Sequence, residues 1–361
     1  MATPHQTDLT HPPATQAWAE RYSVAPGYLS ACTSGLPSAA TAEAMRDFVT
    51  NWAVGDLDAK ALGLQADRCR ELYASLVGVT PAEVAIGSQV SQLVSTVATA
   101  VPDGAEVLCA VGDFASLTHP FEQLAFRGVR VRYAPIGQLA EAIKPSTSLV
   151  VFSLVQSATG EVADYEAIVA AAHLVGARTL VDLTQSAGWL PVGAAHFDYT
   201  VCHAYKWLSA PRGTAFLTVC SGLETEPRPL AAGWCSADDV WSSCYAGHTP
   251  LSAGAGRFDV SPAWPVIGGT EVALREQLAL DPAQVFSHDL GLANAAREIL
   301  GLAPGNSAIV TWADPDGSDL EAMTRGRITA SGRAGNARIS FHLWNTAEDI
   351  ELLGRVLGRS A

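Results

Sequence analysis

The sequence predicts an α/β protein whose large domain contains a mainly parallel sheet, followed by a smaller α+β domain. Three observations support this fold class. Short apolar runs typical of strands alternate with helix-like stretches between residues 84 and 219, and this rhythm indicates a parallel sheet with right-handed crossovers. The run over 149–155 is strongly apolar, as expected for a strand at the centre of such a sheet. After residue 219 the rhythm stops, and clear helix and strand patterns return only from residue 270.

The expected elements follow from these patterns in chain order. Amphipathic helices are expected over 38–52 and 64–77, because apolar residues recur there at helical spacing. Up to residue 219 we further expect a strand at 84–86, a helix to 101, a strand at 106–111, a helix to 127, strands at 129–133 and 149–155, a helix at 165–174, and strands at 179–183, 199–202 and 214–219. In the last third we expect helices at 270–280, 288–300 and 347–357, and strands at 308–312, 327–330 and 337–344.

The same patterns give the domain organisation. We expect an N-terminal extension over residues 1–27, a large cofactor-binding domain over 28–255 and a small C-terminal domain over 256–361. The stretch 221–265 is rich in Gly, Ser, Pro and Trp and shows little periodicity. We therefore expect it to be a long irregular segment at an active site or an interface.

Composition and charge exclude several classes of protein. The chain has 361 residues, of which 48% are hydrophobic and 16% charged, so it can bury a large core. Its net charge of −14 argues against binding to nucleic acid or to anionic membranes. No apolar run is long enough to span a membrane, and the first residues lack the pattern of a signal peptide. Seven scattered cysteines without a CxxC pair favour a reduced, cytoplasmic protein, and the histidine spacing favours no metal.

An acid and a lysine follow two neighbouring strands of the expected sheet. Asp182 closes one strand, and Lys206 lies just beyond the next, which ends at His203. In an open parallel sheet, side chains at the carboxyl ends of adjacent strands converge on one crevice. A site for pyridoxal 5′-phosphate (PLP) needs such a pair, because the lysine forms a Schiff base and the acid pairs with the pyridinium nitrogen.

A glycine turn between a strand and a helix offers a site for a phosphate. The strand at 84–86 runs into Gly87 and Ser88 and then into an apolar helix. This geometry presents free backbone N–H groups to an anion. An ordinary helix start capped by Ser88 is the alternative, and only the later lysine favours the phosphate site.

These residues and several longer motifs resemble the class V aminotransferase-like family of PLP enzymes, which has fold type I. The family includes kynureninases, cysteine desulfurases, isopenicillin N epimerases and C–S lyases. Its fold implies a seven-stranded sheet in the large domain. The stretch from Lys206 to Leu217 is most similar to the isopenicillin N epimerase branch. The motifs that carry the resemblance are DLTQ at 182–185 with Gly188, HAYKWL at 203–208, PRG at 211–213, RFDVSP at 257–262 and RISFHLWNTAED at 338–349.

The resemblance implies roles around the cofactor ring. Lys206 would bind PLP covalently and later move the Cα proton, whereas a solvated surface lysine is the alternative. Asp182 would pair with the ring nitrogen, and its alternative role is to cap the next helix. Gln185 would bind the 3′ oxygen of the ring. Phe114 would stack on the ring, although a simple core phenylalanine competes with this interpretation.

The resemblance also implies residues that bind the phosphate group of the cofactor and the carboxylate group of the substrate. The cofactor phosphate would be bound by Ser88 and the amides of Gln89 and Val90, with side chains of His203 and Tyr205 beside the lysine. A buried histidine without a ligand is the alternative for His203.

Ser261 matches a hydroxyl residue that the family contributes from a neighbouring subunit, which implies a homodimer with shared active sites. Arg338 would grip the α-carboxylate of an amino-acid substrate, and a salt bridge within the small domain is its alternative. His342 would lie on the same side of the strand as Arg338 and support it.

One departure from the family bears on the reaction. Cysteine desulfurases carry a nucleophilic cysteine shortly before the position of Arg338, whereas residues 325–336 contain none. Cys235 and Cys244 are the remaining candidates for a reactive thiol in the irregular segment.

We therefore expect a PLP-dependent enzyme that cleaves the C–S bond of an S-substituted cysteine by β-elimination, with Trp234 and Trp241 accommodating the substituent. The alternatives are an aminotransferase, an epimerase, a decarboxylative deaminase, or a non-catalytic binding protein on the same fold.

Overall fold

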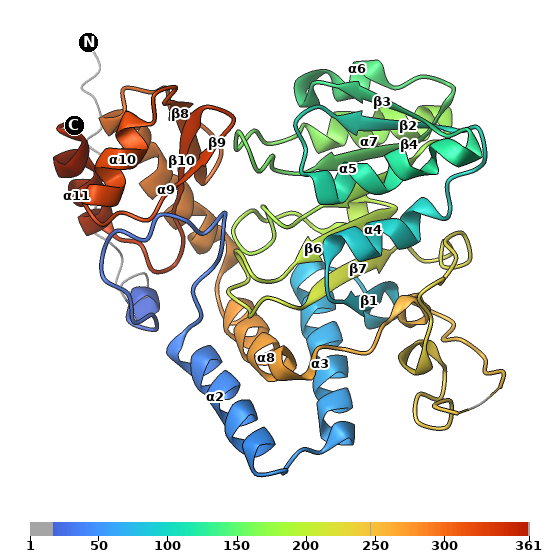
Figure 1. The fold of residues 1–361 in the computed structure, drawn as a ribbon. Coiled ribbons are helices and arrows are strands. Elements are labelled where there is room, and N and C mark those ends of the chain that lie inside the picture. The colour runs from blue at the N-terminus through green and yellow to red at the C-terminus, as the bar shows by residue number, and fades with distance from the viewer. Residues whose placement is uncertain (1–16, 246, 360–361) are drawn as a thin grey trace.

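The computed structural model describes residues 17–245 and 247–359, so most of the extension expected over residues 1–27 lies outside the described residues. Two bodies of structure lie side by side, with the small C-terminal sheet beside the end of a large sheet (Figure 1). In the part of the chain that is described, no helix is both long and apolar enough to cross a membrane.

The large domain is built on a seven-stranded sheet of strand order β1-β7-β6-β5-β4-β2-β3. Five neighbouring strands are parallel, and β7 runs antiparallel to both β6 and β1. The mainly parallel seven-stranded sheet is therefore confirmed. Its strands are β1 (Val84–Gly87), β2 (Glu106–Ala110), β3 (Arg130–Ala134), β4 (Thr147–Ser153), β5 (Arg178–Asp182), β6 (Tyr199–His203) and β7 (Ala215–Val219).

Helices cover both faces of this sheet. Successive strand residues point to opposite faces, and both sets of residues are apolar. Val150 and Phe152 belong to one buried cluster, and Leu149 and Val151 to the other, as the period of two requires. The first cluster contains residues of α3, α7 and α8, and the second contains residues of α4 and α5. The helices of the large sheet are α2 (Ala39–Ala53), α3 (Ala59–Val77), α4 (Val90–Ala98), α5 (Ala115–Glu122), α6 (Leu139–Ala142), α7 (Tyr165–Val175) and α8 (Trp264–Leu278).

The small domain is a three-stranded antiparallel sheet of order β8-β10-β9 with helices packed on it. Leu29 from the beginning of the chain joins its core, and Ser340 N donates to Leu29 O at 2.9 Å. The elements are α9 (Pro282–Ile299), β8 (Ile309–Ala313), α10 (Ser318–Arg325), β9 (Ser331–Arg333), β10 (Asn336–Ser340) and α11 (Ala347–Leu357). The domain boundaries stay a prediction, and α8 contributes Ile267 and Leu274 to the core of the large sheet.

One expected strand is wrong. Residues 327–330 do not form a strand, because Arg327 adopts a left-handed φ of 61° and only Thr329 makes an isolated bridge, to Tyr28. The strand begins at Ser331 instead, and a tight turn at Ala334 and Gly335, both with positive φ, returns the chain into β10. This hairpin places two arginines next to the large domain, as described below.

The irregular segment 221–265 contains short turns, among them η5 (Trp234–Ser236) and η6 (Ala255–Phe258). It extends outward beside β1 in Figure 1. Asp259 fixes its end to the large domain, because it accepts hydrogen bonds from Arg70 at 2.5 Å and from Ile86 N at 2.8 Å. An irregular stretch is thus confirmed here.

Candidate active site

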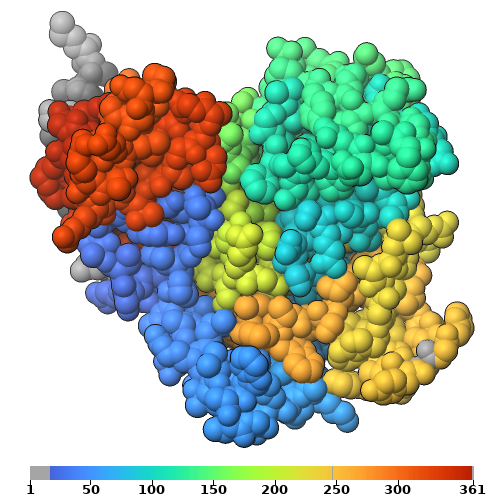
Figure 2. All heavy atoms as spheres, in the orientation of Figure 1, coloured from blue at the N-terminus to red at the C-terminus, as the bar shows by residue number. Residues whose placement is uncertain are grey.

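A cavity of about 250 Å³ lies between the two domains at the carboxyl ends of the central strands. Figure 2 shows the hollow between the red small domain and the green and teal part of the large domain, with yellow-green residues near 200 at its floor. Most residues predicted for the site meet here. The lining residues are Cys32, Thr33, Gln89, Val90, Ser91, Phe114, Ser116, Ser157, His203, Tyr205, Lys206, Arg212, Arg333 and Arg338.

Lys206 lies in the turn after β6, and neighbouring backbone holds this turn tightly. Gly35 N donates to Tyr205 O at 2.8 Å, and a Cβ atom on Gly35 would come within 1.9 Å of Lys206 O. On the other side, Nε2 of the fully buried His342 contacts Trp207 O at 2.8 Å, while its Nδ1 contacts Asp289 at 2.7 Å. His342 therefore supports the segment that carries the lysine.

The amine of Lys206 faces the cavity without a hydrogen-bond or ion-pair partner among the described residues, although the side chain is only 8% exposed. Burial lowers its pKa to about 8, against the opposing charge of Asp182. With a pKa of about 8, about one amine in ten is neutral at pH 7, whereas an ordinary lysine has about one in 3,000. A solvated surface lysine is excluded, and the amine is available as a nucleophile.

Asp182 is the last residue of β5 and is buried near Lys206. Its Oδ1 accepts a hydrogen bond from Thr184 N at 2.8 Å, in a turn that does not start an α-helix. Burial raises the pKa of the carboxyl, and the charge of Lys206 acts in the opposite direction. A carboxylate buried close to the lysine can pair with a protonated ring nitrogen, and each charge then stabilises the other.

Gln185 is engaged more fully than its predicted role requires. Its Nε2 donates to Cys32 O and to Ser157 Oγ, both at 2.9 Å, and its Oε1 accepts from Trp207 Nε1 at 2.9 Å. Both N–H groups of the amide are therefore occupied. A hydrogen bond to the cofactor would require Ser157 to give up its place.

Helix α4 directs its first turn at the cavity. Gln89 and Val90 line the cavity, and Gln89 stands at the N-cap without a capping side-chain hydrogen bond. The first backbone N–H groups of this nine-residue helix are therefore free to bind an anion. Ser88 does not line the cavity, whereas Ser91 in the first turn does, so Ser91 is the better placed hydroxyl.

His203 and Tyr205 line the cavity beside Lys206, as predicted. Burial lowers the pKa of His203 to about 4, so its ring is neutral at pH 7. Its Nδ1 lies 3.3 Å from Thr214 O, which places the single ring proton on Nδ1 and leaves Nε2 as an acceptor. Donation to a phosphate by Nε2 would require a second proton. Arg212, stacked 4.9 Å from the Tyr205 ring, is a stronger candidate.

Arg338 is 1% exposed and has no carboxylate partner among the described residues, so the predicted alternative of a salt bridge does not hold. Its guanidinium donates to Ser331 Oγ at 3.0 Å, to Thr33 Oγ1 at 3.1 Å, and to both oxygens of Ser157. Four of its five N–H groups are thus used. A buried cation without a counter-charge is costly, and an anion in the cavity would relieve that cost.

Phe114 is 56% exposed and lines the cavity, with the Lys206 amine 5.8 Å from the centre of its ring. It is therefore not the core residue that was considered as an alternative. Its side chain occupies a position from which an aromatic ring can cover a flat ligand.

Residues 28–315 match the family model described as aminotransferase class-V. The chain belongs to the class V aminotransferase family. It is accordingly a PLP-dependent enzyme, and the alternative of a non-catalytic binding protein is set aside.

Relatives of this class V aminotransferase family member differ in their named activities. Isopenicillin N epimerase from Streptomyces clavuligerus is 26% identical over 335 residues, covering 80% of this chain and 83% of the relative. A probable cysteine desulfurase from Methanothermobacter thermautotrophicus is 25% identical over 349 residues, covering 83% and 85%.

Solved structures of low identity share the fold. The cystine C–S lyase C-DES, in complex with its product cysteine persulfide, has a TM-score of 0.83 at 20% identity and covers 93% of this chain and 98% of its own. The cysteine desulfurase CsdA from Escherichia coli has a TM-score of 0.82 at 20% identity, covering 95% and 97%. These matches confirm fold type I.

The described residues fit PLP, the cofactor of this family. The amine of Lys206 is buried and unpartnered, Asp182 is a buried acid near it, and α4 opens its N-terminus to the same cavity. An aldehyde, a ring nitrogen and a phosphate are the groups that these three features suit. The individual roles of these residues stay predictions.

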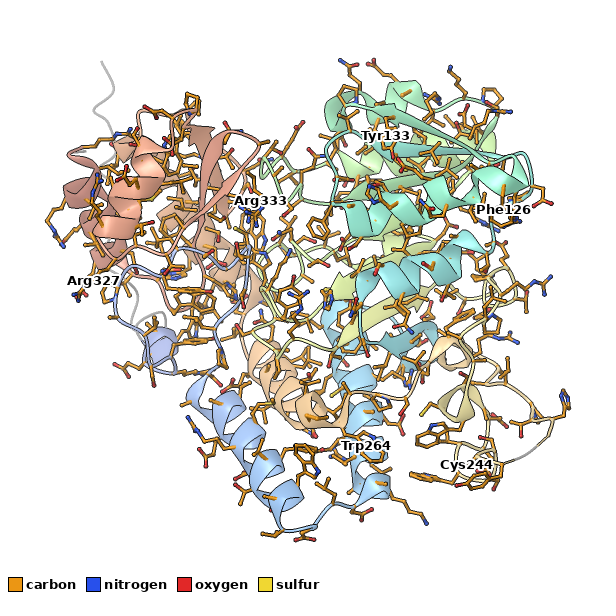
Figure 3. All side chains as sticks on the ribbon, in the orientation of Figure 1. Phe126, Tyr133, Cys244, Trp264, Arg327 and Arg333 are labelled. Carbon is orange, nitrogen blue, oxygen red and sulfur yellow. The ribbon has the colours of Figure 1, made fainter. Side chains whose placement is uncertain are left out.

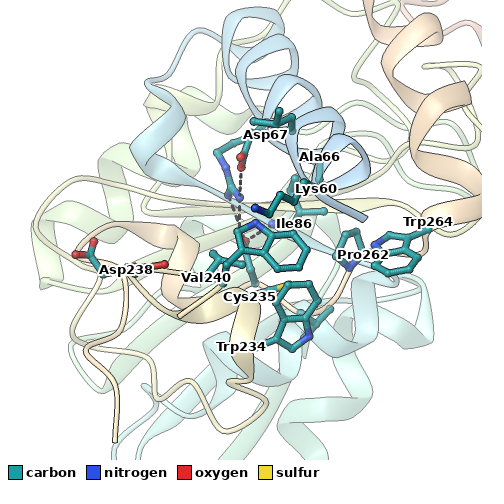
Figure 4. Close-up of a pocket in the computed structure, with 17 residues that line it drawn as sticks. Lys60, Ala66, Asp67, Ile86, Trp234, Cys235, Asp238, Val240, Pro262 and Trp264 are labelled. Carbon is teal, nitrogen blue, oxygen red and sulfur yellow. Dashed lines mark hydrogen bonds and ion pairs between the residues drawn. The ribbon is translucent and has the colours of Figure 1, made fainter. Parts of the chain in front are cut away.

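A second cavity, of about 480 Å³, holds the residues of the irregular segment that the sequence had assigned to the substrate site (Figure 4). Trp234, Cys235 and Trp241 line it beside α3, away from Lys206. Within one chain, the expectation that these tryptophans surround the substrate is therefore wrong. Burial raises the pKa of Cys235 to about 12, which leaves little thiolate at pH 7, and Cys244 is exposed.

Several cavity residues were missed from the sequence. Cys32 lies in a loop of small residues, where nothing marked it as different from its neighbours. Arg333 could have been found from the sequence. In a hairpin that turns at 334–335, Ser331 and Arg333 lie on the same face as Arg338. Thr33, Ser91, Ser116, Ser157 and Arg212 also line the cavity and were not among the predicted site residues.

Proposed function

We propose that this class V aminotransferase family member cleaves the C–S bond of an S-substituted cysteine by β-elimination. The observation that carries the proposal concerns two cations at one small cavity. Arg338 is buried there without a carboxylate partner among the described residues, beside Lys206, whose pKa is lowered. An α-carboxylate at Arg338 would hold an amino acid with its Cα near the lysine. The hairpin of β9 and β10 carries no cysteine, which favours elimination over sulfur transfer at that position.

The residues divide the work as follows. Bound PLP supplies a ring that accepts electrons from Cα and so makes the Cα–H bond acidic. Lys206, partly neutral at physiological pH, would take that proton. Asp182 would keep a proton on the ring nitrogen. The electron pair of the Cα–H bond forms a Cα–Cβ double bond as the sulfur leaves as a thiolate, and water then converts the remaining fragment to pyruvate and ammonia.

The test is incubation of the PLP-loaded enzyme with a series of S-substituted cysteines. We expect one pyruvate and one thiol per turnover, because both products come from the same bond cleavage. The thiol is measured with a disulfide reagent and the pyruvate with a coupled reductase, with Lys60→Ala as an active control variant.

Other products would replace the lyase proposal by a named alternative. Amino transfer to an oxo acid without pyruvate would indicate an aminotransferase, inversion at Cα an epimerase, and release of carbon dioxide a decarboxylative deaminase. With free cysteine as the substrate, alanine together with a persulfide on Cys32 would indicate a desulfurase, a second candidate that the position of Cys32 in the cavity favours.

We further propose that the enzyme is a homodimer in the cytoplasm, with each cavity completed by Ser261 of the partner subunit. Ser261 is exposed and does not line the cavity of its own chain. The segment that carries it exposes apolar side chains, with Leu230 84% and Tyr245 102% exposed, which is typical of a surface that another chain covers. The seven free cysteines suit a reducing compartment.

We expect light scattering after size exclusion to give twice the chain mass of 37.7 kDa. Tyr245→Glu should weaken the dimer, because it places a charge in the interface. PLP affinity should fall together with dimer stability, because a monomer lacks the partner's Ser261 at its cavity. Phe126→Glu is the matched control, since Phe126 is 84% exposed and lies well apart from Cys244, the neighbour of Tyr245, in Figure 3. A monomer with full PLP affinity would rule out the shared site.

A further inference from the structure

The active-site cavity concentrates positive charge in an acidic protein. Lys206, Arg212, Arg333 and Arg338 all line it, whereas no aspartate or glutamate is among its lining residues. None of the four cations has a carboxylate partner in the described part of the chain. The chain as a whole has a net charge of −14, so this concentration of cations is local and points to anionic ligands.

Arg333 and Arg338 project from one face of the hairpin formed by β9 and β10. Arg333 pairs with Asn336 across the hairpin, and Arg338 follows Asn336 by two residues on the same strand. Residues related in this way are diagonal neighbours on one face, with stems roughly 7–8 Å apart. Burial lowers the pKa of Arg338, and the charge of Arg333 acts in the same direction. Two like charges so close are unfavourable until anions lie between or beside them.

The expected anions do not use all of these cations. The cofactor phosphate has the N-terminus of α4 and Arg212 at its disposal, and the substrate α-carboxylate has Arg338. Arg333 is left over: within residues 17–245 and 247–359, its guanidinium makes a single hydrogen bond, to Gly332 O beside it in the chain, at 2.6 Å. In Figure 3 Arg333 lies in the gap between the two domains, while Arg327 of the same domain points away from it.

We propose that Arg333 binds a second acidic group, so that the substrate is an amino acid whose side chain ends in a carboxylate or a similar anion. The inference rests on the proposed amino-acid chemistry at Lys206. For the C–S cleavage proposed above, it names a cysteine whose S-substituent carries a terminal acid. A guanidinium at the rim of the cavity selects such a substituent by charge and leaves the apolar part of the side chain unspecified.

The first experiment compares two substrates of equal shape, S-(2-carboxyethyl)cysteine and its terminal amide, with the PLP-loaded enzyme. We expect kcat/KM to favour the acid by about tenfold or more, because one charge-assisted hydrogen bond distinguishes the two. Arg333→Gln should remove this preference mainly through KM, since Arg333 does not touch the reacting bond. Arg327→Gln is the matched control and should keep the preference.

The second experiment separates this inference from the lyase proposal. Binding of a sulfur-free amino dicarboxylate and of its ω-amide to the PLP-loaded enzyme is followed by calorimetry, with no turnover required. A preference for the dicarboxylate that Arg333→Gln abolishes supports the inference even if no C–S bond is cleaved. Equal binding of acid and amide by the wild type, or a preference that survives Arg333→Gln, overturns it.

Discussion

Lys206→Ala is expected to abolish covalent attachment of PLP and to lower turnover by about a thousandfold or more, because one side chain supplies both the attachment and the proton transfer. The visible absorption band of the wild-type enzyme should be absent from the variant. The chain contains three lysines, Lys60, Lys144 and Lys206. Borohydride reduction followed by peptide mapping should therefore find the label on Lys206 alone.

The pH dependence of this attachment provides an independent check. Burial lowers the pKa of Lys206 to about 8, and only the neutral amine attacks an aldehyde. The rate at which the cofactor-free enzyme takes up PLP should therefore rise as the pH increases towards 8 and level off above it. Lys60→Ala, which changes an exposed lysine, should follow the wild-type curve. A rate that keeps rising past pH 10 would mean that the amine is not desolvated as described.

Asp182→Asn should keep PLP attached but lower kcat by about a hundredfold to a thousandfold. An amide of nearly the same shape cannot stabilise a positive charge on the ring nitrogen, so the ring would accept electrons less readily. Stopped-flow measurement of Cα–H exchange, with deuterium at Cα, would locate the loss in the proton-transfer step.

Asp113→Asn is the matched control for this substitution. Asp113 is a half-buried acid that accepts hydrogen bonds from Ser153 N at 2.8 Å and Gln156 Nε2 at 3.1 Å. Neither acid lines the cavity, but Asp182 lies close enough to Lys206 to raise its pKa. The Asp113→Asn variant should lose stability rather than Cα–H exchange. An equal loss of exchange in both variants would show that Asp182 acts only through the fold.

The sequence was sufficient for features that depend on local periodicity and on strand ends. Short apolar runs predicted every strand of the large sheet, and the convergence of strand ends predicted that Asp182 and Lys206 would lie together. Arg338 was also placed at the cavity, because its position in the family motif fixes it on a strand that faces the large domain.

Features that depend on non-local packing were not predictable in this way. Cys32 reaches the cavity because Ser340, 308 residues away, holds its backbone at 2.9 Å. Ser88 and Ser91 differ only in their position around the start of α4, and no periodicity of the sequence distinguishes them. The strand at 327–330 was misplaced because the left-handed φ of Arg327 is unusual for a residue other than glycine.

The pairing of Leu29 with the C-terminal sheet has a consequence for the order of folding in the cell. Ser340 donates its N–H to Leu29 O and accepts a hydrogen bond from Cys32 N at its Oγ, and this loop supplies Cys32 and Thr33 to the cavity. At roughly 5–20 residues per second, a ribosome needs on the order of a minute or less to reach Ser340. During that time the large sheet can form, but the loop has only its contacts with the large domain, such as Gly35 N to Tyr205 O, and lacks those with β10. A chain truncated before β10 would therefore lack Arg338 and the hydrogen bonds of Ser340 with Leu29 and Cys32, and its pocket would be incomplete.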